Sequence, residues 1–218
     1  MFEGVMFYSN WLQPVIGMSD CMWGLLDGMN GSGLAASLTF GGRRVTGNGF
    51  GIPIIIRYLL ETATTVKEGV AILSRIPVHM AYNVTLLDAT GSFATVYVSP
   101  DRHPVVVNSA VVTNHQGTID WNEYAQMTAT VERKKYLEEM LSTPNETEQS
   151  MVYRFLHPPL YNTNFEKSFG TLYTSVYRIG VGEISILWPD QEIKQSFQHF
   201  TEHKLPRELD SFHKGFVF

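Results

Sequence analysis

The chain has 218 residues, of which 44% are hydrophobic and 17% charged, and its formal net charge at pH 7 is −5. A chain of this length buries roughly 70% of its unfolded surface, so that it needs no metal or disulfide to fold. The acidic balance and the lack of a basic stripe argue against nucleic-acid binding, and the single cysteine, Cys21, excludes a disulfide framework and a multi-cysteine zinc site.

No apolar run approaches the ~20 residues of a membrane span, and the N-terminus lacks the basic and apolar regions of a signal peptide. We therefore expect a cytoplasmic protein that does not bind a membrane. The seven histidines are scattered and show no metal-ligand spacing on a helix, so we expect no metal and no organic cofactor.

The first fifty residues are rich in turn signals. Asn30-Gly31 stands between two apolar runs, and because both residues tolerate a positive φ, the pair predicts a hairpin turn. Residues 41–51 contain too many glycines for regular structure and are interpreted as a loop.

A helical period begins at Ile52 and continues to Ala63, with Pro53 at a first-turn position where its missing N–H costs nothing. Thr65 followed by Glu68 forms a capping box that opens a second helix. That helix ends at Pro77, and its predicted apolar face consists of Val66, Val70, Leu73 and Ile76.

Three β-rich runs follow, over 82–87, 93–98 and 105–112, and a short turn at 88–91 joins the first two. These runs supply the sheet that the two helices would cover. The hairpin chemistry of the 88–91 turn predicts that the strands it joins are antiparallel.

Helical spacing returns over 121–141, where the apolar residues are Tyr124, Met127, Val131, Leu137, Met140 and Leu141. The polar stretch 143–150 is interpreted as a surface loop, and a last hairpin is predicted over 170–188. The order of strands, two helices, strands, helix and strands predicts an α+β layered fold with mainly antiparallel sheets. No repeat or composition shift divides the chain, so residues 1–218 are expected to form a single domain.

Several segments, taken in order, resemble a known family. They are Trp23–Arg43 with its Gly-Met-Asn run, Gly49–Pro53, Arg57–Thr62, Thr65–Glu68, Ile76–Asn83, Val112–Gln116, Phe169–Thr174 and Trp188-Pro189. Together they resemble the linear-amide C–N hydrolases, the peptidase family of penicillin acyltransferases, with choloylglycine hydrolases as distant relatives. The resemblance extends from about Val15 to Phe200.

This resemblance implies an N-terminal-nucleophile (Ntn) hydrolase fold, an αββα sandwich of two mainly antiparallel sheets between helical layers. It also implies a hydrolase or acyltransferase of linear amides, in which an N-terminal cysteine attacks the carbonyl and forms an acyl-thioester. The implied partner is a small-molecule acyl amide.

The resemblance also implies site residues. Asn114 matches the asparagine that receives the oxyanion, and Thr39 stands where distant relatives place a second such asparagine, so that both are candidate catalytic residues. Asn30 and His115 are candidate substrate-binding residues, with a turn-shaping role for Asn30 and a structural polar contact for His115 as the alternatives.

One feature departs from the family pattern. The nucleophilic cysteine of the family lies several tens of residues before the Gly-Met-Asn segment and is followed by an Arg-Asn-x-Asp strand, whereas only twenty residues precede Cys21. We therefore expect a chain that begins internally, without its first strands and its nucleophile. Cys21 is then expected to be a small buried hydrophobic residue rather than the catalytic nucleophile.

Two alternatives remain open. Cleavage before Cys21 would expose an N-terminal thiol and make it the nucleophile. Otherwise the chain is a non-catalytic remnant or a binding protein of the same fold. An unpaired sheet edge would then favour pairing with another chain, which predicts a possible homo-oligomer.

Overall fold

The computed structural model describes residues 5–19, 23–165 and 169–202. The elements follow one another as β1 (Val5–Asn10), β2 (Pro14–Ser19), β3 (Asp27–Asn30), β4 (Ala35–Phe40), α1 (Ile52–Thr62), α2 (Val66–Arg75), β5 (Tyr82–Leu87), β6 (Phe93–Ser99), β7 (Arg102–Val107), α3 (Asn122–Met127), α4 (Thr130–Leu141), α5 (Glu148–Phe155), β8 (Thr163–Asn164), β9 (Phe169–Gly170), β10 (Thr174–Arg178), β11 (Glu183–Trp188) and β12 (Gln191–Ser196).

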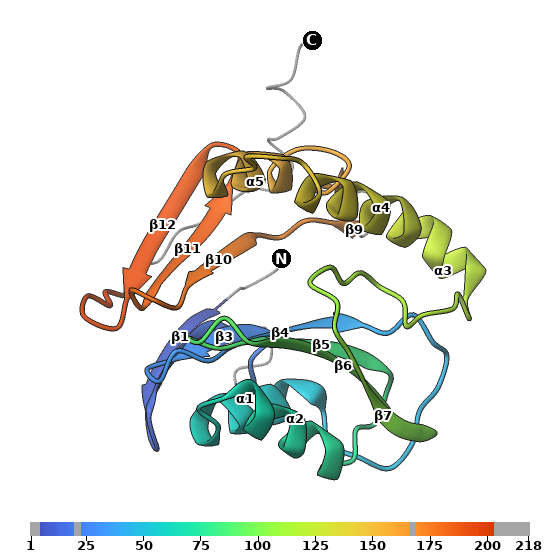
Figure 1. Ribbon diagram of the computed structural model, residues 1–218, viewed down its shortest axis with the longest axis horizontal. Helices are drawn as coiled ribbons and strands as arrows, with labels where there is room; N and C mark the ends of the chain where they lie inside the picture. Colours follow the sequence, from blue (N-terminus) through green and yellow to red (C-terminus); the bar gives the residue numbers. More distant parts are fainter. Residues whose placement is uncertain (1–4, 20–22, 166–168, 203–218) are drawn as a thin grey trace.

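These elements are stacked in layers (Figure 1). Strands β1 to β7 form an antiparallel seven-stranded sheet in chain order, and β10 to β12 form a second antiparallel sheet. Helices α1 and α2 cover one face of the large sheet, the small sheet faces the other, and α4 and α5 lie outside the small sheet. The predicted antiparallel α+β architecture is confirmed.

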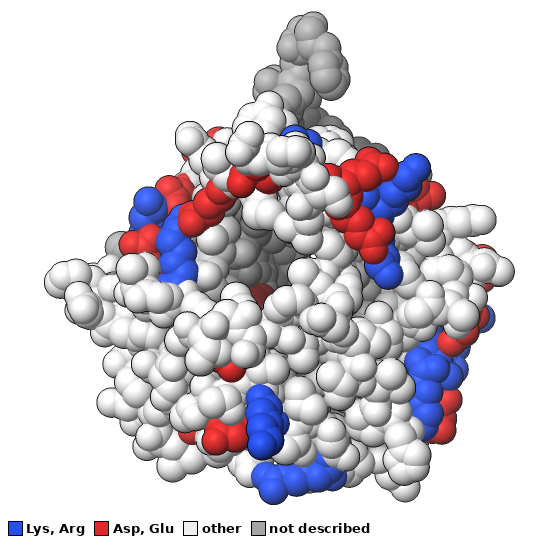
Figure 2. Space-filling model, viewed as in Figure 1, with Lys and Arg blue, Asp and Glu red and all other residues white. Residues whose placement is uncertain are grey.

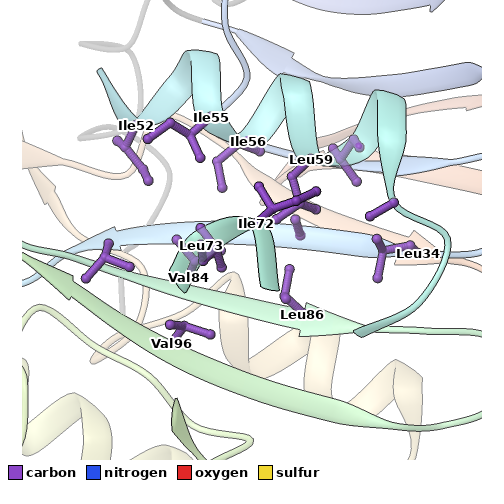
Figure 3. Close-up of a cluster of buried hydrophobic side chains, with 14 of the residues drawn as sticks. Leu34, Ile52, Ile55, Ile56, Leu59, Ile72, Leu73, Val84, Leu86 and Val96 are labelled. Atoms are coloured by element: carbon purple, nitrogen blue, oxygen red, sulfur yellow. The ribbon is translucent and has the colours of Figure 1, made fainter. Parts of the chain in front are cut away.

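The helical layer is held by the face that the sequence period predicts. Ile52, Ile55, Ile56, Leu59 and Leu60 of α1 are all nearly inaccessible to solvent. Figure 3 shows Ile52, Ile55, Ile56 and Leu59 above the β-strand side chains Val84, Leu86 and Val96. Burial of one such side chain stabilises the fold by about 1.5–3 kcal/mol, so this cluster is a main source of stability.

The turns around this layer also agree with the sequence. The capping box of Thr65 and Glu68 is present at the start of α2. The buried face of α2 differs in part from the prediction. Val66 and Leu73 are buried as predicted, Gly69 and Ile72 are buried as well, and the predicted Val70 and Ile76 are only half-buried. The 30–34 turn joins β3 to β4, and residues 41–51 form the expected loop.

A second apolar cluster joins the two sheets. Ile16, Met18 and Met29 of the large sheet pack against Ile184 and Ile186 of β11. Polar contacts accompany this cluster, because the carboxyl of Asp27 on β3 accepts hydrogen bonds from the hydroxyls of Tyr173 and of Tyr177 on β10. The Asp27 carboxyl therefore lies in the space between the two sheets.

The strand prediction over 105–112 was wrong in its limits. Strand β7 spans Arg102–Val107, and residues 108–112 form an irregular segment. Here the Ser109 hydroxyl donates to the Val111 carbonyl and the Ser109 carbonyl accepts from Thr95 Oγ1. These local hydrogen bonds replace the ladder that a longer strand would make.

The helix predicted over 121–141 is broken into α3 and α4. Ala129 adopts a positive φ of 47°, and Thr128 Oγ1 donates back to the carbonyl of Tyr124. The break changes which side chains face inward, so that Met127 and Val131 are about half exposed. Leu137 and Met140 are buried as predicted, and Ala125, Thr128 and Thr130 are buried as well.

Several elements were missed, among them α5 and β12. Helix α5 begins within the predicted loop 143–150, where the Thr147 side chain accepts a hydrogen bond from the Ser150 N–H as an N-cap. Strand β12 extends the predicted last hairpin to a three-stranded sheet. Cys21, predicted to be buried in a strand, lies outside the described residues.

None of the helices in the described part of the chain is both long and apolar enough to span a membrane.

Candidate functional site

The inner face of the large sheet carries side chains in rows that cross the strands. Because alternate residues of a strand point to opposite faces, the register places Ser37, Thr85 and Thr95 in one row that begins at Asp27. A second row contains Thr39, Asn83 and Tyr97. A third row is apolar and contains Met29, Ala35, Leu87 and Phe93.

Part of this face is open. The small sheet packs on β2 and β3, whereas Ser37, Leu87 and Phe93 on the strands beyond them are exposed. Figure 2 shows the molecule hollowed between the two layers, with charged side chains on the rim above the hollow. The open part of the inner face thus offers polar side chains next to the apolar row.

The segment that carries Asn114 is fixed at the polar end of this face. The buried amide Nδ2 of Asn83 donates to the Thr113 carbonyl at 2.9 Å and to the His115 carbonyl at 3.0 Å. It also lies 3.1 Å from Thr39 Oγ1, and Thr39 Oγ1 contacts the Thr113 carbonyl at 3.4 Å. Asn83 thus holds the backbone on both sides of Asn114.

The Asn114 side chain is half-buried and has two neighbours. Arg133 Nη2 donates to Asn114 Oδ1 at 2.6 Å, and Asn114 Nδ2 lies 3.5 Å from the Tyr124 hydroxyl. A distance of 3.5 Å is long for a hydrogen bond. Asn114 therefore has a well-satisfied oxygen and a donor group that a substrate oxygen could use.

Gly42 allows the Asn114 segment to approach the 41–51 loop. A Cβ atom at Gly42 would lie 2.3 Å from the Asn114 carbonyl oxygen, and Gly42 has a φ of +69°. Both the space and the backbone conformation require glycine here.

Aromatic side chains line the region around Asn114. The Tyr124 ring packs edge-on against Phe40, with ring centroids 5.2 Å apart, and stacks on Trp121, with ring centroids 4.9 Å apart. The Arg44 guanidinium lies over the Trp121 ring. Burial raises the pKa of the Tyr124 hydroxyl, so this group remains protonated at neutral pH. It can therefore act as a hydrogen-bond donor as well as an acceptor.

His115 is buried and turned toward α4. Its Nδ1 lies 2.9 Å from Thr130 Oγ1 and 3.3 Å from Thr113 Oγ1. Burial first and the positive charge of Lys134 second lower the pKa of His115, so its imidazole is neutral at neutral pH. These contacts fit the structural role that the sequence left open beside substrate binding.

Asn30 lies apart from this cluster. Its side chain is buried on the helix side, where Nδ2 donates to the carbonyls of Leu60 and Ala63 and Oδ1 accepts from the N–H groups of Ser32 and Leu34. Asn30 thus shapes the 30–34 turn and binds the C-terminal end of α1. Of the four predicted site residues, the structure brings together Thr39, Asn114 and His115.

Sequence reasoning did not identify Asn83, Arg133 or Asp27. Asn83 and Thr85 alternate with the apolar Val84 and Leu86, which is the signal of a strand with one polar face. Arg133 carries no such signal, because its contact with Asn114 depends on the break between α3 and α4.

Burial raises the pKa of the Asp27 carboxyl, although hydrogen bonds from Tyr177 and Tyr173 partly oppose this.

Within the described ranges, no three His, Asp or Glu side chains are placed so that they could hold a metal ion together.

Comparisons with known proteins agree on the kind of molecule. A family model described as acyl-coenzyme A:6-aminopenicillanic acid acyl-transferase matches residues 4–192. A mutant of conjugated bile acid hydrolase from Clostridium perfringens is similar in structure, with a TM-score of 0.61 and 16% identity over 87% of this chain and 78% of that chain. A search of curated proteins found no match.

A second solved structure gives the same result. Penicillin V acylase from Agrobacterium tumefaciens has a TM-score of 0.56 and 18% identity, over 88% of this chain and 71% of that chain. At these identities the likeness concerns the fold. It confirms the predicted arrangement of two antiparallel sheets between helical layers.

Proposed function

Because the chain belongs to the acyl-coenzyme A:6-aminopenicillanic acid acyl-transferase family, we propose that it binds a small-molecule acyl amide and stabilises the oxyanion formed when a cysteine attacks it. The observation that supports this proposal is the orientation of Asn114. Its oxygen accepts from Arg133, so that its NH2 group, which otherwise has only the long 3.5 Å contact with the Tyr124 hydroxyl, can donate to a substrate oxygen. We further propose that residues 1–218 act as one domain.

In the proposed reaction, the thiolate of an N-terminal cysteine attacks the amide carbonyl carbon, and the carbonyl electrons move to the oxygen. Asn114 Nδ2 donates to this oxyanion, a contribution of about 3–4 kcal/mol in comparable sites. Collapse of the intermediate breaks the C–N bond, and the leaving amine takes a proton from the cysteine α-ammonium. Water or a second amine then attacks the thioester and releases the thiol.

Thr39 has a supporting role in this proposal. Its hydroxyl already contacts Asn83 Nδ2 and the Thr113 carbonyl. It therefore stabilises the segment that carries Asn114, while its backbone N–H is the group to test as a second oxyanion donor.

We propose that the nucleophilic cysteine is encoded ahead of Met1, as the spacing of the family resemblance implies. The test is to express the gene product with its upstream in-frame sequence and to treat it with p-nitrophenyl hexanoate. After an acid quench, intact mass and peptide mapping should locate one hexanoyl group on an N-terminal cysteine. The matched control replaces that cysteine with alanine.

The 218-residue chain is treated in parallel. No acylation of this chain is expected. A hexanoyl group on Cys21, together with loss of the first twenty residues, would instead identify Cys21 as the nucleophile. Absence of acylation in both proteins would contradict the proposed function and favour a non-catalytic binding protein.

A further inference from the structure

Arg133 is placed to control the orientation of the Asn114 amide. We propose that Arg133 is a positioning residue, which holds Asn114 Oδ1 away from the substrate so that Nδ2 faces the oxyanion. This inference rests on the proposed function, and it adds a role for a residue on α4 that does not itself touch the substrate.

The chemistry of the pair selects one amide orientation. A guanidinium has only hydrogen-bond donors, so the Asn114 atom at 2.6 Å from Arg133 Nη2 has to be the carbonyl oxygen. The NH2 group then points away from Arg133. In the flipped orientation the NH2 group would face a cation, and Oδ1 would face the negative substrate oxygen.

Arg133 is itself held in place. Its Nε donates to the Thr128 carbonyl at 2.9 Å, in the break between α3 and α4. Both contacts use a single planar group, which fixes the direction of Nη2 more tightly than a lysine ammonium would.

Arg133 lacks a counter-ion in the part of the chain that the structure describes, where no carboxylate lies within 4.0 Å of its guanidinium. Removing a cation from water without a paired carboxylate disfavours folding, and burial accordingly lowers the pKa of Arg133. Its guanidinium instead donates hydrogen bonds to Asn114 Oδ1 and to the Thr128 carbonyl, so this cation serves the orientation of Asn114 rather than an ion pair.

The test uses the cysteine-bearing gene product with an acyl amide substrate. Arg133→Met should lower kcat about 100-fold, as removal of an oxyanion donor does, with little change in KM. Arg133→Lys should recover part of kcat, since it restores one donor. Lys135→Met, which removes an exposed charge from the same helix, should leave kcat unchanged.

The double variant distinguishes positioning from a general structural role. If Arg133 acts through Asn114, Arg133→Met should lower kcat no further in an Asn114→Ala background. A loss that is equally large in both backgrounds would overturn the inference, as would full kcat in Arg133→Met. If Asn114→Ala itself keeps full kcat, the proposed function fails. Thermal unfolding of each variant identifies any that do not fold, in which case Arg133→Lys carries the test.

Discussion

Single residues position the candidate site through the backbone as much as through side chains. Asn83 is buried and donates to the carbonyls on both sides of Asn114, whereas Gly42 lies against the Asn114 carbonyl from the opposite loop. The Nδ2 group of Asn83 already donates to these carbonyls, and Gly42 has no side chain. Their effect on function would pass through the position of Asn114.

Gly42 allows a sharp test at this scale, because Gly117 has the same φ of +69° but no atom within 4 Å of its would-be Cβ. Gly117→Ala should cost about 1 kcal/mol of unfolding free energy from backbone strain alone. Gly42→Ala adds the clash with Asn114 and should cost about 2 kcal/mol more, within the range seen for overpacking. Urea unfolding measures both, and equal losses would show that the close contact is not maintained.

At the scale of elements, the sequence predicted most where side-chain period and caps act locally. Helix α1, the capping box at Thr65 and strand β5 agree with the prediction because their apolar spacing matches the face that is buried. The prediction of a single helix over 121–141 was wrong because the chain breaks at Ala129, which has a positive φ, and the next residue, Thr130, is hydrogen-bonded to the distant Thr113–His115 segment. The same break brings Arg133 to Asn114.

The corrected inward face of α4 gives a second prediction. Leu137 is 9% exposed, whereas Val131 is 49% exposed, although both belonged to the predicted apolar face. Leu137→Ala should therefore cost about 2–4 kcal/mol, and Val131→Ala should change stability by less than about 0.5 kcal/mol. Chemical denaturation of both variants tests this. A similar loss in both would support an unbroken helix with its predicted face buried.

The candidate site was predictable in part, because some of its residues lie in short segments that can be identified locally in the sequence. Asn114 and Thr39 were identified by a resemblance carried in short segments, and the structure places them within one polar cluster with His115. Asn30 stands in an equally distinctive segment but binds the end of α1. The resemblance of a sequence segment can assign a residue to a family pattern. Only the contacts of its side chain show whether that side chain lies on the inner face or on the helix-covered face of the sheet.

At the scale of the whole molecule, Asp27 links the two sheets through Tyr173 and Tyr177. Burial raises its pKa, so the folded chain keeps a proton that the unfolded chain releases above about pH 3.9. The unfolding free energy therefore falls as pH rises from there through the raised pKa. Asp27→Asn carries no such proton and should lose less stability over that range.

Asp88 supplies a control of opposite sign. Hydrogen bonds from Thr90 and from the Val66 N–H lower its pKa, so its contribution is present above about pH 3.9 and is lost as pH falls through the lowered value. Urea unfolding of the wild type, Asp27→Asn and Asp88→Asn between about pH 3 and pH 7 compares the two. Parallel pH profiles for the wild type and Asp27→Asn would show that the Asp27 carboxyl is ionised in the fold.

The layered fold brings the inner face of the large sheet, the Asn114 segment and α4 together, and the proposed role of Asn114 is the claim on which the account depends. The most direct measurement is the single-turnover rate of acylation of the cysteine-bearing gene product, comparing the wild type with Asn114→Ala and with Asn122→Ala, an exposed asparagine of α3. We predict that Asn114→Ala lowers this rate about 10²–10³-fold while Asn122→Ala leaves it unchanged. An acylation rate that Asn114→Ala does not alter would contradict the account.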